Sequence, residues 1–509
     1  MSKELKQKMR SGGIWLVLSN ILTIASQLLA VALLSRMLGP EAFGIHGNGL
    51  LLLELTAVFT YPFINKSIIL KKEASAEYLS TATTLSFLLS AAAGLILFFS
   101  APFIAAFFHH DSIVFVVRTI SVIFLLKGFY QPYQSVFERD LRFREISNVN
   151  LAASWLGFLI VPVCLAYYGF GYKSLILGLL AYELVFLIYF TIRSRLYFGR
   201  LSPTLAREII TDARHLILQA LGNKLATNGD YLIISRFLGP AALGYYTQAY
   251  KIMKMPTTII GNVINSLSFA SLSKISEDND KLRKAFVYSS FILALFSFPI
   301  LVITLLFSKE IVLILLGPKW LSTIPVLQIL SFGIFLRMSY KVPGTILKAK
   351  QLFRLTARIQ IIYALNILVF SVLMIRFGIE GVAIGTLAAL ALQYGQLCWH
   401  VARVTGATVA DFYTILLRPM AFAAIVGGTA FLLRLGISTV TVLRDEFSFI
   451  IVMLFILPAA LYFIHRYGLV FFGEPYAWWL DFATSKKERK EKKNRVKPGK
   501  TVPVTIDTL

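Results

Sequence analysis

Long uninterrupted runs of apolar residues dominate the pattern of hydrophobic and polar positions along this chain. The runs at 14–34 and 285–307 contain no Asp, Glu, Lys or Arg. Each exceeds the roughly 20 residues that a helix needs to cross a ~30 Å hydrocarbon core. Runs of this kind recur about fourteen times, which predicts an all-α polytopic membrane protein with about fourteen transmembrane helices. The expected spans are 14–34, 43–64, 82–108, 112–131, 149–168, 173–192, 215–237, 243–265, 285–307, 321–340, 359–376, 381–400, 414–433 and 447–465.

Composition and charge agree with a membrane protein. Of the 509 residues 57% are hydrophobic and only 15% are charged, against about 25% charged residues in soluble domains. The net charge of +24 comes from basic residues concentrated in alternate loops, so the positive-inside rule predicts that both termini are cytoplasmic and that the chain contacts membrane lipids rather than nucleic acid. These basic residues are Arg139, Arg142 and Arg144, then Arg193, Arg195, Arg200, Arg207 and Arg214, then Lys348, Lys350, Arg354 and Arg358.

One passage occurs twice. SRMLGPEAFG at 35–44 and SRFLGPAALG at 235–244 share seven of ten letters, and each ends one span and begins the next. Turn chemistry at Gly39–Pro40 and Gly239–Pro240 could explain the shared letters alone, since Gly-Pro favours a tight structural turn. A second pair, KGFYQP at 127–132 and RMSYKVP at 337–343, favours duplication. We therefore predict two six-helix repeats related by a pseudo-two-fold axis along the membrane normal, plus two extra helices.

This repeat gives a predicted division of the chain. The first apolar run is too long for a signal peptide and is expected to remain as a span. The predicted parts are a cytoplasmic N-terminus (1–13), an N-lobe of spans 1–6 (14–200), a C-lobe of spans 7–12 (201–405), spans 13 and 14 (406–470) and a basic cytoplasmic tail (471–509), either disordered and solvated or attracted to anionic lipid.

Catalytic and metal-binding patterns are weak. Cys164 and Cys398 fall inside expected spans and are predicted to be buried apolar residues. His109–His110–Asp111 could bind a metal but lacks a second ligand cluster, and Gly499–Lys500–Thr501 lacks the earlier glycine of a phosphate-binding loop, where Asn494 stands. The sequence predicts no metal, no cofactor and no enzyme activity.

Basic residues inside spans are the strongest functional candidates, because such groups normally face the protein interior or water. Lys254, eleven residues into its span, lies about 16 Å deep, whereas Lys127 and Arg337 lie near cytoplasmic ends, where long side chains can also reach the headgroups. The predicted cavity cations are Arg118, Lys127, Lys224, Lys251, Lys254 and Arg337.

Three acidic residues inside spans, Glu54, Glu183 and Asp230, are candidates for a gate or for proton or sodium coupling, and structural pairing with a nearby lysine is the alternative. Glu54 and Lys254 occupy equivalent positions in the two repeats, so a pair between them across a cavity is one such hypothesis.

The passages LGPEAFG, DYLIISRFLGPAALGYYTQAYKIMKMP (230–256), FERDLRFRE and LLGPKWLSTIPVLQIL (315–330) resemble the Wzx-type polysaccharide exporters, specifically the colanic-acid-exporter-like branch of the multidrug/oligosaccharidyl-lipid/polysaccharide superfamily. The resemblance covers roughly residues 10 to 465. It implies a flippase of the bacterial inner (plasma) membrane that moves undecaprenyl-diphosphate-linked oligosaccharide by alternating access for surface polysaccharide biosynthesis, with the polymerase or export machinery as a further partner.

Three other functions remain open. A multidrug exporter of the same superfamily would need a carboxylate-rich pocket for cationic drugs, whereas these spans carry more Lys and Arg than Asp and Glu. A lipid II-type flippase would share the basic cavity, but the sequences of such flippases are less similar to the LGP passages of this chain. A membrane glycosyltransferase or polymerase would need catalytic carboxylates beside a sizeable external loop.

Overall fold

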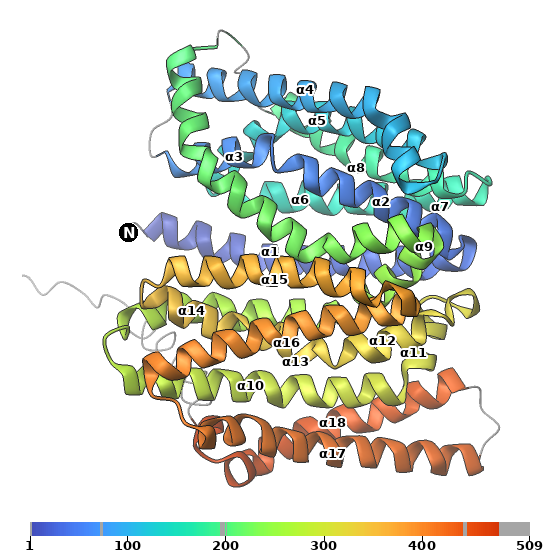
Figure 1. Cartoon of the computed structure of the whole chain (residues 1–509), viewed down its shortest axis with the longest axis vertical. Coiled ribbons are helices and arrows are strands. Elements are labelled where there is room, and N and C mark those ends of the chain that lie inside the picture. The colour runs from blue at the N-terminus through green and yellow to red at the C-terminus, as the bar shows by residue number, and fades with distance from the viewer. Residues whose placement is uncertain (1–2, 72–74, 194–198, 200, 441–444, 478–509) are drawn as a thin grey trace, which may run out of the picture. The chain divides into compact units, whose positions relative to one another are not determined.

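The structure is a computed structural model that describes residues 3–71, 75–193, 199, 201–440 and 445–477. These residues form helices joined by short turns, with no strand among them (Figure 1), so the all-α prediction is confirmed. The helices are α1 (Lys3–Met37), α2 (Pro40–Ala57), α3 (Tyr61–Leu70), α4 (Ala76–Phe108), α5 (Ser112–Arg139), α6 (Phe143–Ser154), η1 (Trp155–Ile160), α7 (Val161–Tyr167), α8 (Tyr172–Arg193), α9 (Pro203–Lys274), α10 (Asn279–Leu306), α11 (Ser308–Leu315), η2 (Pro318–Trp320), α12 (Thr323–Ser331), α13 (Gly333–Ser339), α14 (Lys341–Ala349), α15 (Phe353–Met374), η3 (Ile375–Phe377), α16 (Gly378–Thr405), α17 (Val409–Val440) and α18 (Asp445–Phe472).

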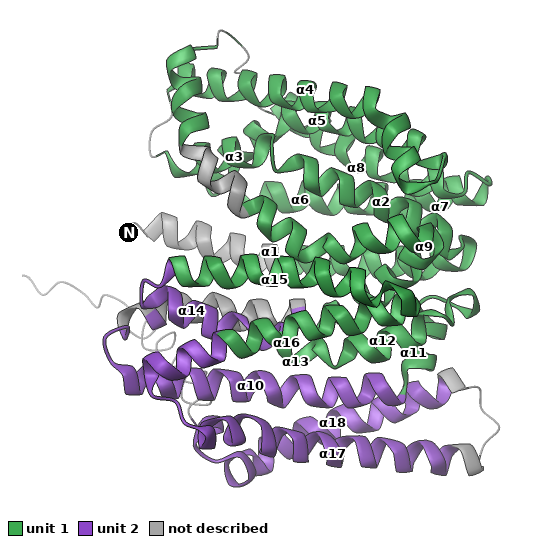
Figure 2. Ribbon diagram, viewed as in Figure 1, with its two compact units in different colours: residues 1–256, 307–336, 354–396 green, residues 257–306, 337–353, 397–509 purple. Residues whose placement is uncertain are grey.

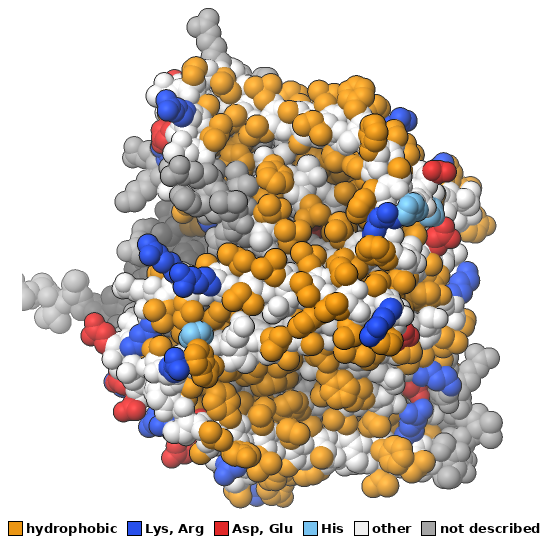
Figure 3. Space-filling view, in the orientation of Figure 1, with side chains coloured by type: hydrophobic (Ala, Val, Ile, Leu, Met, Phe, Trp, Pro, Cys, Tyr) orange, Lys and Arg blue, Asp and Glu red, His pale blue; other side chains and the backbone are white. Residues whose placement is uncertain are grey.

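These helices are those of a polytopic membrane protein. Within the described ranges, nine helical segments are long and apolar enough to cross a membrane, and two bent pairs bring the number to eleven if each pair is one span. Large apolar side chains point outward from them, as Phe103 of α4 does at 79% exposure. Figure 3 shows hydrophobic side chains across the visible surface, with most charged side chains toward the helix ends, which is the distribution that a lipid-facing surface requires.

The chain divides into two compact units, shown in Figure 2. Unit 1 contains residues 1–256, 307–336 and 354–396. One of its cores lies between α2, α4, α5 and α8 and includes the fully buried residues Ile120 and Phe124 of α5 and Ile176 of α8. Helices α4 and α5 lie together along their length because small residues permit it: a Cβ on Gly128 would overlap Ser90, and one on Gly94 would come within 2.9 Å of the Ser121 carbonyl oxygen.

Two of the predicted spans in unit 1 are interrupted. Helices α2 and α3 meet at a 53° bend. Helices α6 and α7 are joined by the π-helical turn η1, where Gly157 lies directly against Tyr182 of α8 and a Cβ would come within 2.5 Å. Such breaks are tolerated inside a membrane where neighbouring helices cover the backbone, which indicates that these segments lie against protein.

Unit 2 contains residues 257–306, 337–353 and 397–509, of which the structure describes 257–306, 337–353, 397–440 and 445–477. Its centre is the packing of α17 against α10 and α18 (Figure 1). A Cβ on Gly427 of α17 would overlap Val302 of α10, so this packing also depends on glycine. Arg434 donates a hydrogen bond to the Leu306 carbonyl oxygen (2.8 Å), and Arg418 donates one to that of Phe472 (2.9 Å), which satisfies two helix ends.

Three sequence predictions need comment. Cys398 is buried as predicted, but the prediction for Cys164 is wrong: it is exposed, on a face of α7 that no described helix covers. The predicted lobe boundary at residue 200 falls inside unit 1 and stays a prediction. The basic tail beyond residue 477 and the Gly499–Lys500–Thr501 segment lie outside the described residues.

Candidate functional site

A group around Glu54 joins the helices that carry the duplicated turns. Glu54 lies on α2, and its Oε2 accepts hydrogen bonds from Lys224 Nζ and from Asn228 Nδ2 of α9, both at 2.9 Å. The Glu54 and Lys224 side chains remain 45% and 39% exposed. Sequence equivalence suggested Lys254 as the partner of Glu54, whereas these two bonds come from the helix before the second Gly-Pro turn.

A second group is buried between α5, α8 and α3. Lys127 Nζ lies 2.8 Å from Glu183 Oε1, and the hydroxyl of Tyr130 donates to Glu183 Oε2 at 2.6 Å. The Lys127 side chain is 14% exposed and that of Glu183 only 2%. Lys127 also lies over the Tyr61 ring, 5.8 Å from its centroid. The lysine does not extend to the headgroups here, because its charge is already compensated inside the helices.

The same network extends to α3 through amide side chains. Gln131 follows Tyr130 on α5, and its Oε1 accepts a hydrogen bond from Asn65 Nδ2 at 2.7 Å. Tyr61, four residues before Asn65, is the ring over which Lys127 lies. The segment after the bend between α2 and α3 therefore contacts the Lys127–Glu183 group through both Tyr61 and Asn65.

A third group surrounds Asp230 of α9, which is 2% exposed. The hydroxyl of Tyr246 donates to Asp230 Oδ2 at 2.8 Å and lies 3.0 Å from the hydroxyl of Thr386 on α16. Thr386 also donates to Asp230 Oδ2 at 3.4 Å. Asp230 and Tyr246 stand on opposite sides of Gly239 in α9, so the kink there brings the carboxylate and the phenol together.

The remaining predicted cations are not gathered with these groups. Lys251 and Lys254, on the second half of α9, are exposed. Arg118 is exposed on α5 and lies over the Phe98 ring of α4, 5.1 Å from its centroid. Arg337 is half-buried and belongs to unit 2. The structure therefore brings together Lys127 with Glu183 and Lys224 with Glu54, whereas Lys251 and Lys254 are residues with a large exposed fraction on the second half of α9.

The two Gly-Pro turns differ in backbone conformation. Gly239 has φ 84° and ψ 176°, which other residues rarely adopt, whereas Gly39 has φ −84° and ψ 172°, which any residue adopts. A Cβ on either glycine would meet no atom within 4 Å. Both turns interrupt helical geometry, and only the second requires glycine.

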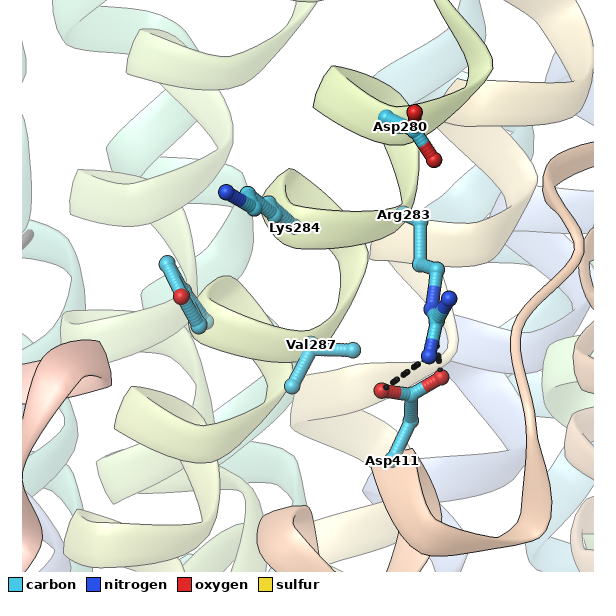
Figure 4. A pocket seen from close by; sticks show the side chains of 6 residues that line it. Asp280, Arg283, Lys284, Val287 and Asp411 are labelled. Carbon is cyan, nitrogen blue, oxygen red and sulfur yellow. Dashed lines mark hydrogen bonds and ion pairs between the residues drawn. The ribbon is translucent and has the colours of Figure 1, made fainter.

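Unit 2 holds a separate pocket of about 330 Å³, lined by Asp280, Arg283, Lys284, Val287, Tyr288 and Asp411 (Figure 4). Arg283 makes two bonds to Asp411, with Nε 2.7 Å from Oδ2 and Nη2 3.2 Å from Oδ1. Its two acidic and two basic residues leave no net charge, so this pocket does not resemble an anion site.

Sequence reasoning did not assign roles to Tyr130, Tyr246 and Thr386. Tyr130 stands three residues after Lys127, so both can reach one carboxylate from one helix face, and this spacing was a usable signal. Thr386 had no such signal. Within the described residues no three His, Cys, Asp or Glu side chains lie together as metal ligands; His109 contacts Arg236, and His110 lies 3.1 Å from Glu41.

Comparison with known proteins identifies the family. The profile of a family described as polysaccharide biosynthesis protein matches residues 33–325. The chain belongs to this polysaccharide biosynthesis family. The teichuronic acid biosynthesis protein TuaB of Bacillus subtilis is 23% identical over 451 residues, covering 84% of this chain and 89% of TuaB. The lipopolysaccharide biosynthesis protein WzxC of Escherichia coli is 27% identical over 371 residues, covering 71% and 73%. The resemblance to Wzx-type exporters is thus confirmed.

Solved structures share the fold of this polysaccharide biosynthesis family member. The lipid II flippase MurJ in an inward closed conformation aligns with a TM-score of 0.71 at 16% identity, covering 89% of this chain and 99% of MurJ. An inward-facing multidrug resistance MATE family transporter aligns with a TM-score of 0.56 at 15% identity, covering 76% and 96%. At these identities the likeness concerns the fold alone.

Proposed function

We propose that this chain is a flippase that moves undecaprenyl-diphosphate-linked oligosaccharide across the bacterial inner membrane for surface polysaccharide biosynthesis. Its relatives include WzxC, TuaB and, from Haloferax volcanii, the probable low-salt glycan biosynthesis flippase Agl15, which is 25% identical and covers 74% of this chain and 80% of Agl15. On this reading the chain is a transporter rather than an enzyme.

The observation that carries the proposal is the set of exposed cations deep in the spans. Lys254 stands fourteen residues after Pro240, about 21 Å along the helix. An ammonium that is exposed at this depth must face water, because a charge exposed to lipid at this depth is very unfavourable. Lys251 and Lys254 supply positive charge where a diphosphate would pass, and anionic ligands favour such a surface. Lys224 would join them if an anionic substrate replaced its partner Glu54.

The proposed architecture has fourteen spans. In the described part of the chain, eleven spans are counted when each bent pair is one span. The segment 353–405 becomes two spans if it is divided at Gly378, and the two halves of α9 on either side of Gly239 are two more spans. An even number puts both termini on one side, which the basic loops assign to the cytoplasm. The repeats would then rock as two lobes about a cavity that holds the exposed cations, with α17 and α18 as the two extra spans.

The proposed energy source is an ion gradient, with Glu183, Asp230 and Glu54 as carriers. Glu183 receives the ammonium of Lys127, so protonation of Glu183 would release that lysine toward an anionic substrate. Asp230 is surrounded by the hydroxyl groups of Tyr246 and Thr386, oxygen atoms that suit either a proton or sodium.

A lipid II-type flippase is the second candidate, favoured by the MurJ fold. The substrates of both candidates carry a diphosphate on a polyprenyl lipid, and they differ in the sugars attached to it. A multidrug exporter is less consistent with exposed lysines, since these would repel cationic drugs.

The test is a census of lipid-linked sugars by mass spectrometry in a deletion strain. A flippase for polysaccharide repeat units should cause accumulation of one undecaprenyl-diphosphate oligosaccharide on the cytoplasmic side, reversed when the gene is restored. Accumulation of lipid II would identify the second candidate. An unchanged lipid-linked pool would contradict both.

A further inference from the structure

The two copies of the duplicated passage touch each other in unit 1, and the contact is reciprocal. A Cβ placed on Gly44 would overlap the carbonyl oxygen of Pro240, and a Cβ placed on Gly244 would overlap that of Pro40. Both glycines are buried. Residue 44 thus contacts residue 240 as residue 244 contacts residue 40, which is the pattern of a self-complementary, two-fold interface.

We propose that the two Gly-Pro-x-x-x-Gly segments, 39–44 and 239–244, form one self-complementary joint, and that this joint is a gate that separates and closes again during transport. The gating half of this inference rests on the proposed alternating-access function. The joint itself explains why the same letters occur twice: each copy supplies the proline carbonyl and the glycine that the other copy needs. With no Cβ in the way, each glycine Cα–H can approach the opposing carbonyl oxygen.

Exposure changes along the helices that leave the joint. On the second half of α9, Gly244, Thr247 and Gln248 are buried, whereas Lys251 and Lys254 are exposed. On α2, Asn48 is fully buried, whereas the Glu54 side chain is 45% exposed. Burial is therefore complete near the Gly-Pro end of both helices, and exposed charged side chains occur further along each, as expected for a transporter closed at the Gly-Pro end.

An unsatisfied amide lies one turn beyond the joint on α2. Both polar atoms of the Asn48 side chain are buried without a hydrogen-bond partner among the described residues. Such a group costs roughly 1–3 kcal/mol relative to one that is solvated. Separation of the helices would let water form hydrogen bonds with Asn48. The free energy gained from these bonds would offset part of the packing energy that is lost when the joint opens.

Two loops support the joint, one from each repeat. Trp320 is fully buried, donates to the Ser35 carbonyl oxygen at 2.9 Å and lies edge-on to the rings of Phe43 and Tyr245, with centroids 5.2 and 6.0 Å away. Arg36 donates to the Ile314 carbonyl oxygen at 2.8 Å.

The duplicate arginine, Arg236, contacts His109 in the loop of the first repeat. Each arginine that precedes a Gly-Pro turn thus contacts the end of a helix in the other repeat, Arg36 that of α11 and Arg236 that of α4.

A first experiment measures the joint without any substrate. In a background with Cys164→Ser and Cys398→Ser, Thr247→Cys places a thiol just below the joint. A membrane-impermeant maleimide added outside should label it slowly, because a minor open state typically accounts for about 0.1–10% of molecules. Adding Gly44→Ala, or from the other side Gly244→Ala, should raise the labelling rate about 10- to 100-fold, since the clash prevents closure.

The matched control is Gly47→Ala, one turn further along α2, where a Cβ would meet Leu243 and Thr247 at an ordinary 3.4–3.8 Å. It should leave the labelling rate within about twofold of the parent. If folded Gly44→Ala and Gly244→Ala proteins label no faster than this control, the proposed joint is overturned.

A second experiment does not depend on folding of the alanine variants. Gly47→Cys with Thr247→Cys places two thiols close enough for a disulfide or a short bifunctional thiol reagent, because the Gly47 Cβ position lies 3.8 Å from Thr247 Cγ2. The cross-linked protein should not transport and should recover on reduction. If it transports as fast as its reduced form, the joint is static and the gate is overturned. If the parent protein also fails to transport, the proposed function is contradicted. The labelling experiment needs no substrate and would still test the joint.

Discussion

Replacing Lys127 should destabilise the protein far more than replacing Lys224, although both lysines pair with a glutamate inside the spans. The Glu183 side chain is 2% exposed and its neighbours are Lys127 and Tyr130, so Lys127→Met leaves a buried carboxylate with one hydroxyl donor. Removing one partner of a buried ion pair costs about 3–5 kcal/mol. Lys224→Met removes a pair whose members are 39% and 45% exposed, and such pairs contribute about 1 kcal/mol or less.

The assay is the free energy of unfolding in detergent, from denaturant titrations of the parent, both single variants and a double variant, Lys127→Met with Glu183→Leu. The double variant should recover much of the lost stability, because no uncompensated charge remains. If Lys127→Met costs no more than Lys224→Met, the two groups do not differ as their burial indicates. A double variant that is stable but fails to transport would assign the charges to the transport cycle.

Three further predictions follow from the structure and the sequence. Reporter fusions should all report a cytoplasmic location after Lys72, Arg144, Arg207 and Lys350, and a periplasmic signal at Arg207 would reverse the proposed orientation. Gly239→Ala should lower the thermal midpoint, because a residue with a Cβ at this positive φ and extended ψ costs roughly 1–3 kcal/mol, whereas Gly39→Ala should change it little; equal effects would contradict the difference in φ. Lys254→Ala should reduce transport of a lipid-linked diphosphate in reconstituted vesicles while Lys254→Arg retains part of it, and unchanged transport by the alanine variant would remove Lys254 from the substrate path.

The helices and the duplication were predictable because their signals are local or repetitive. Apolar runs mark spans whatever surrounds them, and the LGP letters could be aligned without a structure. The partner of Glu54 was not predictable in this way. Sequence equivalence placed Lys254 opposite Glu54, whereas the crossing of α2 with the first half of α9 brings Lys224 and Asn228 to that carboxylate.

The hydroxyl groups of the candidate site illustrate a second limit. Thr386 and Tyr246 bond to Asp230, yet many Thr and Tyr residues in these spans look the same in the sequence. Cys164 shows the converse, since an apolar residue in a span can face lipid as easily as protein. Which face of a helix is covered depends on neighbours hundreds of residues away, and a single sequence does not contain that information in readable form.

The long sequence separation of the paired charges has a consequence for synthesis of the protein. Glu54 and Lys224 are 170 residues apart, so at about 5–20 residues per second the glutamate waits roughly 9–34 s for its partner to leave the ribosome. Lys127 waits roughly 3–11 s for Glu183. During these intervals each newly inserted helix carries a lone charge in the bilayer, a state that favours binding by insertion factors and recognition by membrane proteases. The early spans are therefore committed to the membrane before they are stable there, and the yield of mature protein depends on how quickly the later spans arrive.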